Sequence, residues 1–215
     1  MKKLKYIIFD CDGVLVDSEI IANRIEAEYK TELGFPITIE EHIRQFVGSS
    51  LKAPEVQEIL RRLPSHYLKT VDARVHEAYL AELKAVSGIP EILNSLTTPV
   101  CVASNSLPEW IERKLTITGL AKYFPGAMFS SQSVKYGKPA PDLFFYAAEK
   151  MGWNPSECLV VEDSEAGVRA GVAAGMTVVG FLGGAHILPG HSERLLAAGT
   201  HFLTSDIREI SRFLR

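Results

Sequence analysis

Short apolar runs recur along the chain and are separated by polar or helical stretches. They cover residues 5–10, 99–105, 127–131, 158–163 and 177–182. Runs of this length that are rich in aromatic and β-branched residues predict buried strands. Helical patterns lie between the later runs, over residues 107–119, 141–152 and 165–175. This alternation predicts right-handed β-α-β units, and therefore an α/β fold in which a doubly wound parallel sheet has helices on both faces.

The predicted helices carry recognisable end signals. Ser106, with Glu109 three residues later, predicts a capping box at the start of the helix over 107–119. Pro141 stands at a first-turn position, and Gly152 closes the same helix. These signals predict short helices, each of which returns the chain to the next strand.

Residues 19–86 break the alternation. Amphipathic stretches fill this segment, at 19–33, 38–46, 54–63 and 66–84. Thr38 with Glu41 predicts a second capping box, while Gly88 and Pro90 mark a return linker. We therefore expect two domains, an α/β core of residues 1–16 and 88–215 and an inserted helical domain of residues 17–87.

The composition is that of an ordinary globular protein. Of the 215 residues, 47% are hydrophobic and 23% are charged, which excludes an intrinsically disordered chain. The formal net charge is −3 and the Lys and Arg residues are scattered, so nucleic acid and anionic membrane surfaces are not expected partners. No apolar run approaches the length of a membrane span.

The first residues and the cysteines indicate in which cellular compartment the protein is expected. The apolar part of "MKKLKYIIF" is too short for a secretory signal. The three cysteines, Cys11, Cys101 and Cys158, show no CxxC spacing, which fits reduced thiols. Cys11 has no histidine near it in the sequence and is interpreted as a buried structural residue rather than a nucleophile. We expect a cytoplasmic protein that is a monomer or a weak homo-oligomer.

Acidic residues follow the buried strands, where ionised groups are costly unless they are paired or bound to a metal. Ligands of open α/β sheets bind at the carboxyl ends of the strands. The residues expected to converge there are Asp10, Asp12, Ser104, Asn105, Lys138, Glu162 and Asp163. Carboxylates without His or Cys among them suit a hard cation, Mg²⁺ before Zn²⁺. Such a cation and Lys138 would together bind a phosphate dianion.

Four motifs resemble, in order and spacing, those of the haloacid dehalogenase superfamily of phosphotransferases. They are "DCDGVLVDSE", "VASNS", "GKPAPD" and "VVEDSEAG". The helical insert resembles the α-helical cap of the β-phosphoglucomutase-like branch. The resemblance implies a Rossmann-like catalytic core and a cap domain that selects the substrate.

The resemblance also implies roles for individual residues. Asp10 matches the nucleophile that becomes an aspartyl phosphate, and Asp12 matches the general acid and base. Ser104 matches the hydroxyl that hydrogen-bonds the phosphoryl group, and Lys138 matches the cation that offsets charge on Asp10. The groups that would bind Mg²⁺ are the side chains of Asp10 and Asp163 and the backbone carbonyl of Asp12. Glu162 would either bind the ion itself or contact one of the residues that bind it.

The residue five positions after Asp17 bears on which reaction of the family this chain catalyses. Sugar phosphomutases of this branch carry a cap histidine there, whereas this chain has Ala22, which favours water as the acceptor. The presence of Asp12 argues against a dehalogenase or a phosphonate hydrolase. The chain is therefore most similar to Mg²⁺-dependent phosphatases of small phosphorylated metabolites, above all bacterial sugar-phosphate phosphatases. A sugar phosphomutase, a phosphoglycolate phosphatase and a non-catalytic phosphate-binding regulator stay open as alternatives.

Substrate selection is expected in the segment "FVGSSLK", residues 46–52. This segment resembles the substrate-specificity loop of the branch. The residues expected to bind the substrate are Gly48, Ser49 and Lys52 in this loop, with Ser104, Asn105 and Lys138. The alternative for Lys52 is a solvated surface charge.

Other residues near the motifs have structural interpretations. Asp17 is interpreted as a cap of the first inserted helix or turn, with a substrate or hinge role as the alternative. His186 and His191 flank the loop "HILPGH" and are interpreted as solvated. Gly167 and Gly171 are interpreted as close-packing sites of the last predicted helix.

Overall fold

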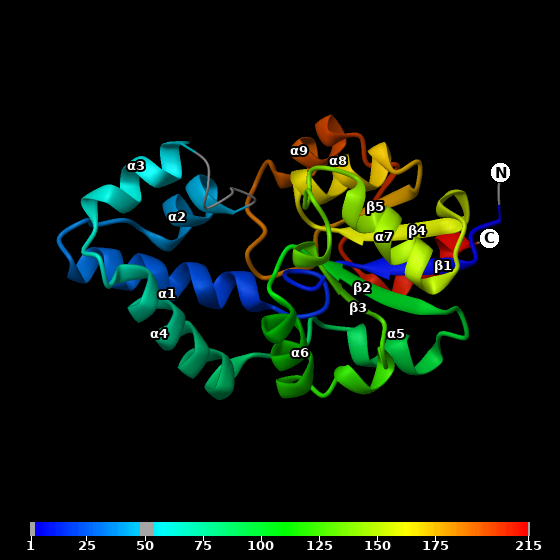
Figure 1. Cartoon of the computed structure of the whole chain (residues 1–215), viewed down its shortest axis with the longest axis horizontal. Coiled ribbons are helices and arrows are strands. Elements are labelled where there is room, and N and C mark those ends of the chain that lie inside the picture. Colours follow the sequence, from blue (N-terminus) through cyan, green and yellow to red (C-terminus); the bar gives the residue numbers. More distant parts are fainter. Residues whose placement is uncertain (1–2, 48–53, 215) are drawn as a thin grey trace. The chain divides into compact units, whose positions relative to one another are not determined.

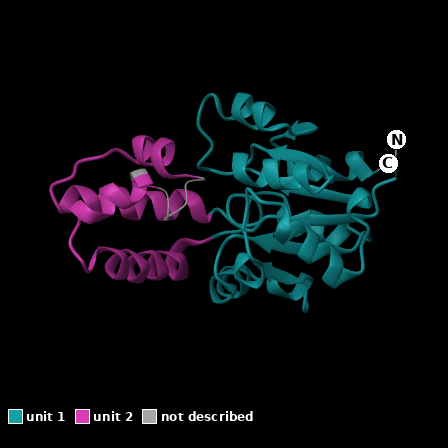
Figure 2. Ribbon diagram, turned by 45° about the horizontal axis from the view of Figure 1, so that its top comes forward, with its two compact units in different colours: residues 1–17, 84–215 teal, residues 18–83 magenta. Residues whose placement is uncertain are grey.

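The chain folds into two compact units (Figure 2). A computed structural model describes residues 3–47 and 54–214. The α/β unit comprises residues 1–17 and 84–215, and the helical unit comprises residues 18–83. The α/β unit begins again at Lys84, before the predicted residue 88, because the Asp17 N–H donates to the Lys84 carbonyl at 3.1 Å. That the helical unit acts as a cap domain stays a prediction.

The α/β unit is built on a six-stranded sheet in the order β3-β2-β1-β4-β5-β6, and its strand pairs are all parallel. The strands are β1 (Tyr6–Phe9), β2 (Val100–Ser104), β3 (Met128–Ser130), β4 (Cys158–Glu162), β5 (Thr177–Phe181) and β6 (Phe202–Thr204). The predicted doubly wound α/β fold is confirmed. The sequence pattern missed β6, because a strand of three residues leaves almost no periodicity to recognise.

Helices lie on both faces of this sheet (Figure 1). One face carries α5 (Ile89–Ser95) and α6 (Pro108–Ile117), and the other carries α7 (Asp142–Met151), α8 (Glu165–Ala173) and α9 (His191–Ala198). The described residues of the unit also form 3₁₀ helices: η1 (Ala121–Tyr123), η2 (Ser131–Ser133), η3 (Pro155–Glu157) and η4 (Ile207–Leu214). The chain winds outward from β1 to β3 and then from β4 to β6, so the winding reverses between β1 and β4. Ligand sites of such sheets lie at this reversal.

The central strands are apolar on both faces because helices cover both faces. All five residues of β4 are buried, and so are the last three residues of β1. Continuous apolar strands of this kind are typical of parallel sheets. The three cysteines are buried and free, and burial raises the thiol pKa of each, that of Cys158 to about 12. The interpretation of Cys11 as a structural residue agrees with this burial.

The helix ends follow the predicted signals in some places and not in others. Gly152 closes α7 with φ +70°. The predicted capping box of Ser106 and Glu109 was wrong, because α6 begins at Pro108 after Leu107 and has no side-chain cap. The Ser106 hydroxyl instead donates a hydrogen bond to the Asp12 carboxylate.

The helical unit contains α1 (Ser18–Glu32), α2 (Ile39–Phe46), α3 (Pro54–Arg62) and α4 (Tyr67–Glu82). A buried polar cluster joins α1 to α2: the Lys30 Nζ lies 2.6 Å from His42 Nε2, and the Nδ1 of that ring lies 2.8 Å from Asn23 Oδ1. Lys30 also lies over the Phe46 ring, 3.6 Å from its centroid. These paired groups fix how the two helices pack.

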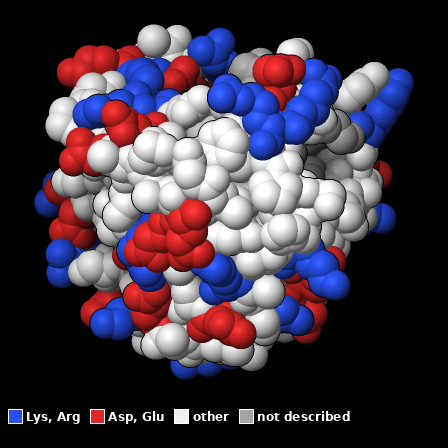
Figure 3. Space-filling model, turned by 90° about the vertical axis from the view of Figure 1, so that its left-hand side faces the viewer, with Lys and Arg blue, Asp and Glu red and all other residues white. Residues whose placement is uncertain are grey.

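The surface shows no concentration of one charge on the face drawn in Figure 3, where Lys and Arg side chains are interspersed with Asp and Glu side chains. This mixture agrees with the small net charge of −3. None of the helices in the described part of the chain has the length and apolar character needed to cross a membrane.

The capping box of α2 generates a stability prediction. The Thr38 Oγ1 accepts the Glu41 N–H at 3.2 Å, and Glu41 accepts the Thr38 N–H in return at 2.9 Å. We expect Thr38→Ala to lower the free energy of unfolding by about 0.5–2 kcal/mol, the range for losing such a cap. Urea unfolding followed by circular dichroism measures this change. Thr38→Ser keeps the hydroxyl and should retain most of the stability; equal losses in both variants would contradict the role of the cap.

Candidate active site

The strand pairing places acidic residues at the reversal of the sheet. Asp10 directly follows β1, Glu162 ends β4, and Asp163 follows it. Because the Asp10 N–H donates to the Val161 carbonyl at 3.0 Å, Asp10 is drawn alongside Glu162. The three acids are 7%, 0% and 3% exposed respectively. The carboxyl edge of the two central strands thus holds three buried acids.

Lys138 is the cation inside this group. Its Nζ lies 2.7 Å from Asp10 Oδ1 and 2.5 Å from Glu162 Oε1. The same Nζ donates to the Ala103 carbonyl at 2.7 Å, at the end of β2. One buried ammonium therefore ties together three strands at their carboxyl ends.

Burial and mutual repulsion dominate the electrostatics of the cluster. Burial raises the pKa of Asp10 to about 7, although the Lys138 charge lowers it. Burial and then the charge of Asp10 raise the pKa of Asp163 well above its usual range. Burial lowers the pKa of Lys138, but the charges of Asp10 and Glu162 outweigh it and leave that pKa raised. One ammonium among three carboxylates leaves negative charge that a divalent cation would offset.

The donor set fits such a cation. Oxygens of Asp10, Glu162 and Asp163 all lie within 4.8 Å of one another, and all are carboxylate oxygens, which suits Mg²⁺. Glu162 is also engaged from both sides, because its Oε2 accepts the Ser164 hydroxyl at 3.0 Å while its Oε1 faces Lys138.

Asp12 has a separate set of partners. Its Oδ2 accepts the Ser106 hydroxyl at 2.8 Å and lies 3.4 Å from the Ser104 hydroxyl. Its Oδ1 forms an ion pair with Lys114 on α6. Lys114 was not predicted from the sequence, because a lysine in a helix is ordinarily solvated. The signal that could have found it is its place on the apolar face of α6, beside Leu115, which is fully buried.

Asn105 is placed against the main chain of Lys138. Its Oδ1 accepts the Lys138 N–H and its Nδ2 donates to the Lys138 carbonyl, each at 3.0 Å. A Cβ at Gly137 would come within 2.6 Å of Asn105 Oδ1, so this contact requires glycine there. The amide group therefore orients Lys138, a task that its predicted role in binding substrate did not include.

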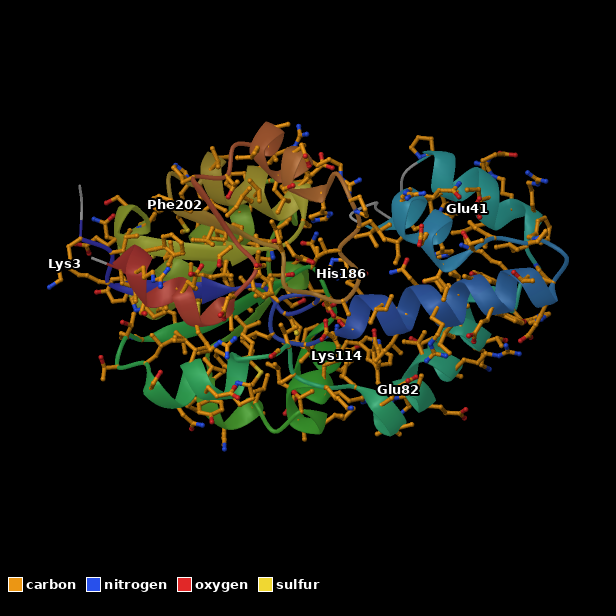
Figure 4. All side chains as sticks on the ribbon, turned by 180° about the vertical axis from the view of Figure 1, so that it is seen from behind. Lys3, Glu41, Glu82, Lys114, His186 and Phe202 are labelled. Carbon is orange, nitrogen blue, oxygen red and sulfur yellow. The ribbon has the colours of Figure 1, made fainter. Side chains whose placement is uncertain are left out.

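The interpretation of His186 and His191 as solvated was wrong. They are 1% and 5% exposed, because the loop after β5 folds over the loop that follows β1. His186 Nε2 lies 2.9 Å from Asp163 Oδ2, and His191 Nε2 lies 2.5 Å from the Asp163 carbonyl oxygen. Burial lowers the pKa of His191. Figure 4 labels His186 in this loop. Both imidazoles hold a residue of the acidic cluster.

The loop after β1 also contacts the loop after β5 near its C-terminal end, at Asp17. Asp17 Oδ1 accepts the Ala185 N–H at 2.9 Å, so its carboxylate joins the loops that follow β1 and β5. At Gly13, φ is +74° and a Cβ would collide with Asp163 Oδ2. The predicted cap-loop residues Gly48, Ser49 and Lys52 lie outside the described residues.

Two glycines of α8 let the helix approach the sheet. A Cβ at Gly167 would collide with the Glu162 carboxylate, and one at Gly171 would lie 2.8 Å from Val178 Cγ2. The prediction that both are close-packing sites is confirmed. Gly167 is in addition part of the wall of the acidic cluster.

Both sequence and fold are similar to those of known proteins. A family model for haloacid dehalogenase-like hydrolases matches residues 4–175. A 6-phosphogluconate phosphatase of Escherichia coli (strain K12) is 34% identical over 195 residues, which cover 88% of this chain and 87% of that protein. A haloacid dehalogenase-like protein of Agrobacterium tumefaciens has a TM-score of 0.89 and 35% identity, covering 98% of this chain and 97% of its own. A hydrolase of the same family from Deinococcus radiodurans, solved with bound phosphate and sodium, has a TM-score of 0.81 and 28% identity. The match covers 99% of this chain and 95% of that hydrolase.

The glycines of α8 generate a prediction about cation binding. Gly167→Ala forces a methyl group against the Glu162 carboxylate and should displace it. We expect a loss of about 1–3 kcal/mol in stability from overpacking, and a cation affinity lower by roughly 10–100-fold. Thermal unfolding and titration calorimetry with Mg²⁺ measure the two effects.

Gly171→Ala on the same helix is the matched control. Its methyl group meets Val178, away from the carboxylates, so stability should fall while the Mg²⁺ affinity stays that of the wild type. Equal Mg²⁺ affinities in the two variants would show that Glu162 does not shape the cation site.

Proposed function

The chain belongs to the haloacid dehalogenase-like hydrolases, and from this premise we propose that it is a Mg²⁺-dependent phosphatase that hydrolyses a small sugar phosphate through a phosphorylated Asp10. The predicted family and class of enzyme, a phosphoric monoester hydrolase, are confirmed by the family match and by a relative named as a phosphatase. The observation that carries the finer proposal is the buried cluster in which Lys138 contacts both Asp10 and Glu162.

Asp10 is the proposed nucleophile. Its position at the end of β1, with Lys138 on Oδ1, supports a carboxylate held still for attack on phosphorus. The attack forms a bond between an Asp10 oxygen and phosphorus and breaks the ester bond to the sugar oxygen. Phosphoryl transfer depends mainly on such positioning and on charge neutralisation.

Asp10 and Asp163 are the proposed holders of Mg²⁺, with the Asp12 carbonyl and with Glu162 as a ligand or a partner of ligands. When bound, the ion offsets negative charge on the phosphoryl oxygens. Lys138 adds a second positive charge next to Asp10. Ser104, which is 2% exposed, offers a hydroxyl beside these groups for a phosphoryl oxygen.

Asp12 is the proposed proton carrier. It gives a proton to the leaving sugar oxygen in the first step. In the second step it takes a proton from the water that attacks phosphorus, and the bond between the Asp10 oxygen and phosphorus breaks, which frees the Asp10 carboxylate. The hydroxyls of Ser104 and Ser106 against its Oδ2 support this assignment, because hydroxyls both donate and accept hydrogen bonds.

A sugar phosphate is the proposed substrate class, supported by the relative named 6-phosphogluconate phosphatase. Ala22 in α1, where phosphomutases of the branch carry histidine, supports water over a second sugar phosphate as acceptor. Free buried cysteines are compatible with the proposed cytoplasmic location. The predicted monomer or weak homo-oligomer stays a prediction.

The nucleophile generates the first functional prediction. Asp10→Asn should lower kcat on p-nitrophenyl phosphate by roughly 10⁴-fold or more, on the scale of losing a covalent nucleophile. Beryllium fluoride, which mimics an aspartyl phosphate, should inhibit and stabilise the wild type but not this variant. Asp72→Asn, at an exposed position of α4, is the matched control and should behave as the wild type. Comparable turnover in Asp10→Asn would exclude Asp10 as the nucleophile.

The proposed metal site generates the second functional prediction. Removing divalent ions with EDTA should abolish phosphate release, and excess Mg²⁺ should restore it. Asp163→Asn should weaken Mg²⁺ binding by at least about 10-fold in titration calorimetry, because a buried oxygen ligand loses its charge. Full activity in a metal-stripped sample, or unchanged Mg²⁺ affinity in Asp163→Asn, would refute this part of the proposal.

A further inference from the structure

The carboxylate of Asp12 is held by one group within the four motifs, the Ser106 hydroxyl, and by one outside them, the Lys114 ammonium. Lys114 on α6 forms an ion pair with Oδ1, and its Nζ also donates to the Ser106 hydroxyl at 3.1 Å. The Ser106 hydroxyl in turn donates to Oδ2 at 2.8 Å. Lys114, Ser106 and Asp12 therefore form a closed ring of three side chains.

Lys114 is not a surface lysine. Its side chain is 4% exposed, and it lies on the face of α6 whose neighbours Ile111 and Leu115 are 1% and 0% exposed. A buried ammonium costs several kcal/mol unless a charged partner offsets it. An apolar residue would pack this face without that cost, so Asp12 is the reason for a lysine here.

The two aspartates of the first motif thus have different lysines. Asp10 pairs with Lys138, which reaches the end of β1 from the segment before α7. Asp12 pairs with Lys114, which reaches the same loop from α6 on the other face of the sheet (Figures 1 and 4). Each carboxylate is fixed independently of the other.

The donors around Asp12 also decide which oxygen can carry a proton. An ammonium group donates hydrogen bonds and accepts none, so the oxygen facing Lys114, Oδ1, must accept. Hydroxyl groups can do either, so Oδ2, which faces Ser106 and Ser104, is the oxygen that can bear a hydrogen. The proton therefore has one defined place on the side chain.

We propose that Lys114 is a positioning residue that fixes the Asp12 carboxylate so that Oδ2 delivers its proton to the leaving oxygen of the ester; this inference rests on the proposed phosphatase reaction. In that step an Asp10 oxygen bonds to phosphorus, and the ester P–O bond breaks with its electron pair on the leaving oxygen. The proton of Oδ2 moves to that oxygen and leaves a free alcohol. In the second step water attacks phosphorus, the Asp10–phosphorus bond breaks, and the water proton returns to Oδ2.

The proposal predicts a dependence on the leaving group. A sugar alkoxide leaves poorly unless it is protonated, whereas p-nitrophenolate leaves without a proton. Lys114→Met keeps the length and apolar stem of the side chain and removes the ammonium. We expect its kcat/KM on 6-phosphogluconate to fall by about 10²-fold or more, within the range for general acid catalysis, while kcat/KM on p-nitrophenyl phosphate changes by less than about 5-fold.

Two further variants make the test specific. Ser106→Ala removes the nearer of the two hydroxyls on Oδ2 and should show the same selective loss, which keeps the proposal testable if Lys114→Met unfolds. Lys150→Met, an exposed lysine at the end of α7, is the matched control and should leave both substrates unaffected. Thermal unfolding of each variant reports whether it is folded.

Equal losses on both esters in folded variants would overturn the proposal, because Lys114 would then support the fold or the whole site rather than proton transfer. Unchanged kcat/KM on both esters would overturn it as well. A wild type that releases phosphate from neither ester with Mg²⁺ would overturn the phosphatase proposal and this inference with it, and that failure is seen before any variant is made.

Discussion

Buried negative charge is the constraint on which the α/β unit depends. Parallel pairing of β1 with β4 places Asp10 next to Glu162 at the ends of two largely apolar strands. Carboxylates in such surroundings are costly unless cations and hydrogen-bond donors surround them. Neighbouring features of the fold serve this need: Lys138 lies between two of the acids, Asn105 fixes its main chain, and Gly167 leaves the space that the Glu162 carboxylate occupies.

The sequence predicts this part of the molecule well because the causes are regular. Apolar runs define the strands, and parallel strands bring their carboxyl ends to one edge, so the residues after Phe9, Ser104 and Glu162 had to meet. The four acids and Ser104 were predicted in this way, whereas Lys138 was predicted from the resemblance of "GKPAPD" to a family motif. The apolar periodicity does not predict which side chain pairs with each acid. Such a partner can come from any segment that the tertiary fold brings close.

The failures share one physical reason, which is that long-range contacts override local preference. Ser106 and Glu109 have the spacing of a capping box, but the Ser106 hydroxyl bonds to Asp12, far away in the sequence. His186 and His191 stand in a glycine-rich loop that is typical of solvated residues, yet the loop packs on Gly13 and buries both rings against Asp163. In each case a polar side chain that local rules assign to water or to a helix end is needed by the buried carboxylates.

The division of partners between Asp10 and Asp12 gives two identical side chains different chemistry. Asp10 is buried beside other carboxylates and shares Lys138 with Glu162, so nearby cations favour the charged form that its proposed role as nucleophile requires. Asp12 lies in a less acidic setting, where one oxygen faces an ammonium and the other faces hydroxyls that tolerate either protonation state. Environments that differ in this way are how one residue type serves as both a nucleophile and an acid in a single site. Two buried lysines separate the two proposed roles: Lys138, in the segment before α7, contacts Asp10 and Glu162, and Lys114, in α6, contacts Asp12.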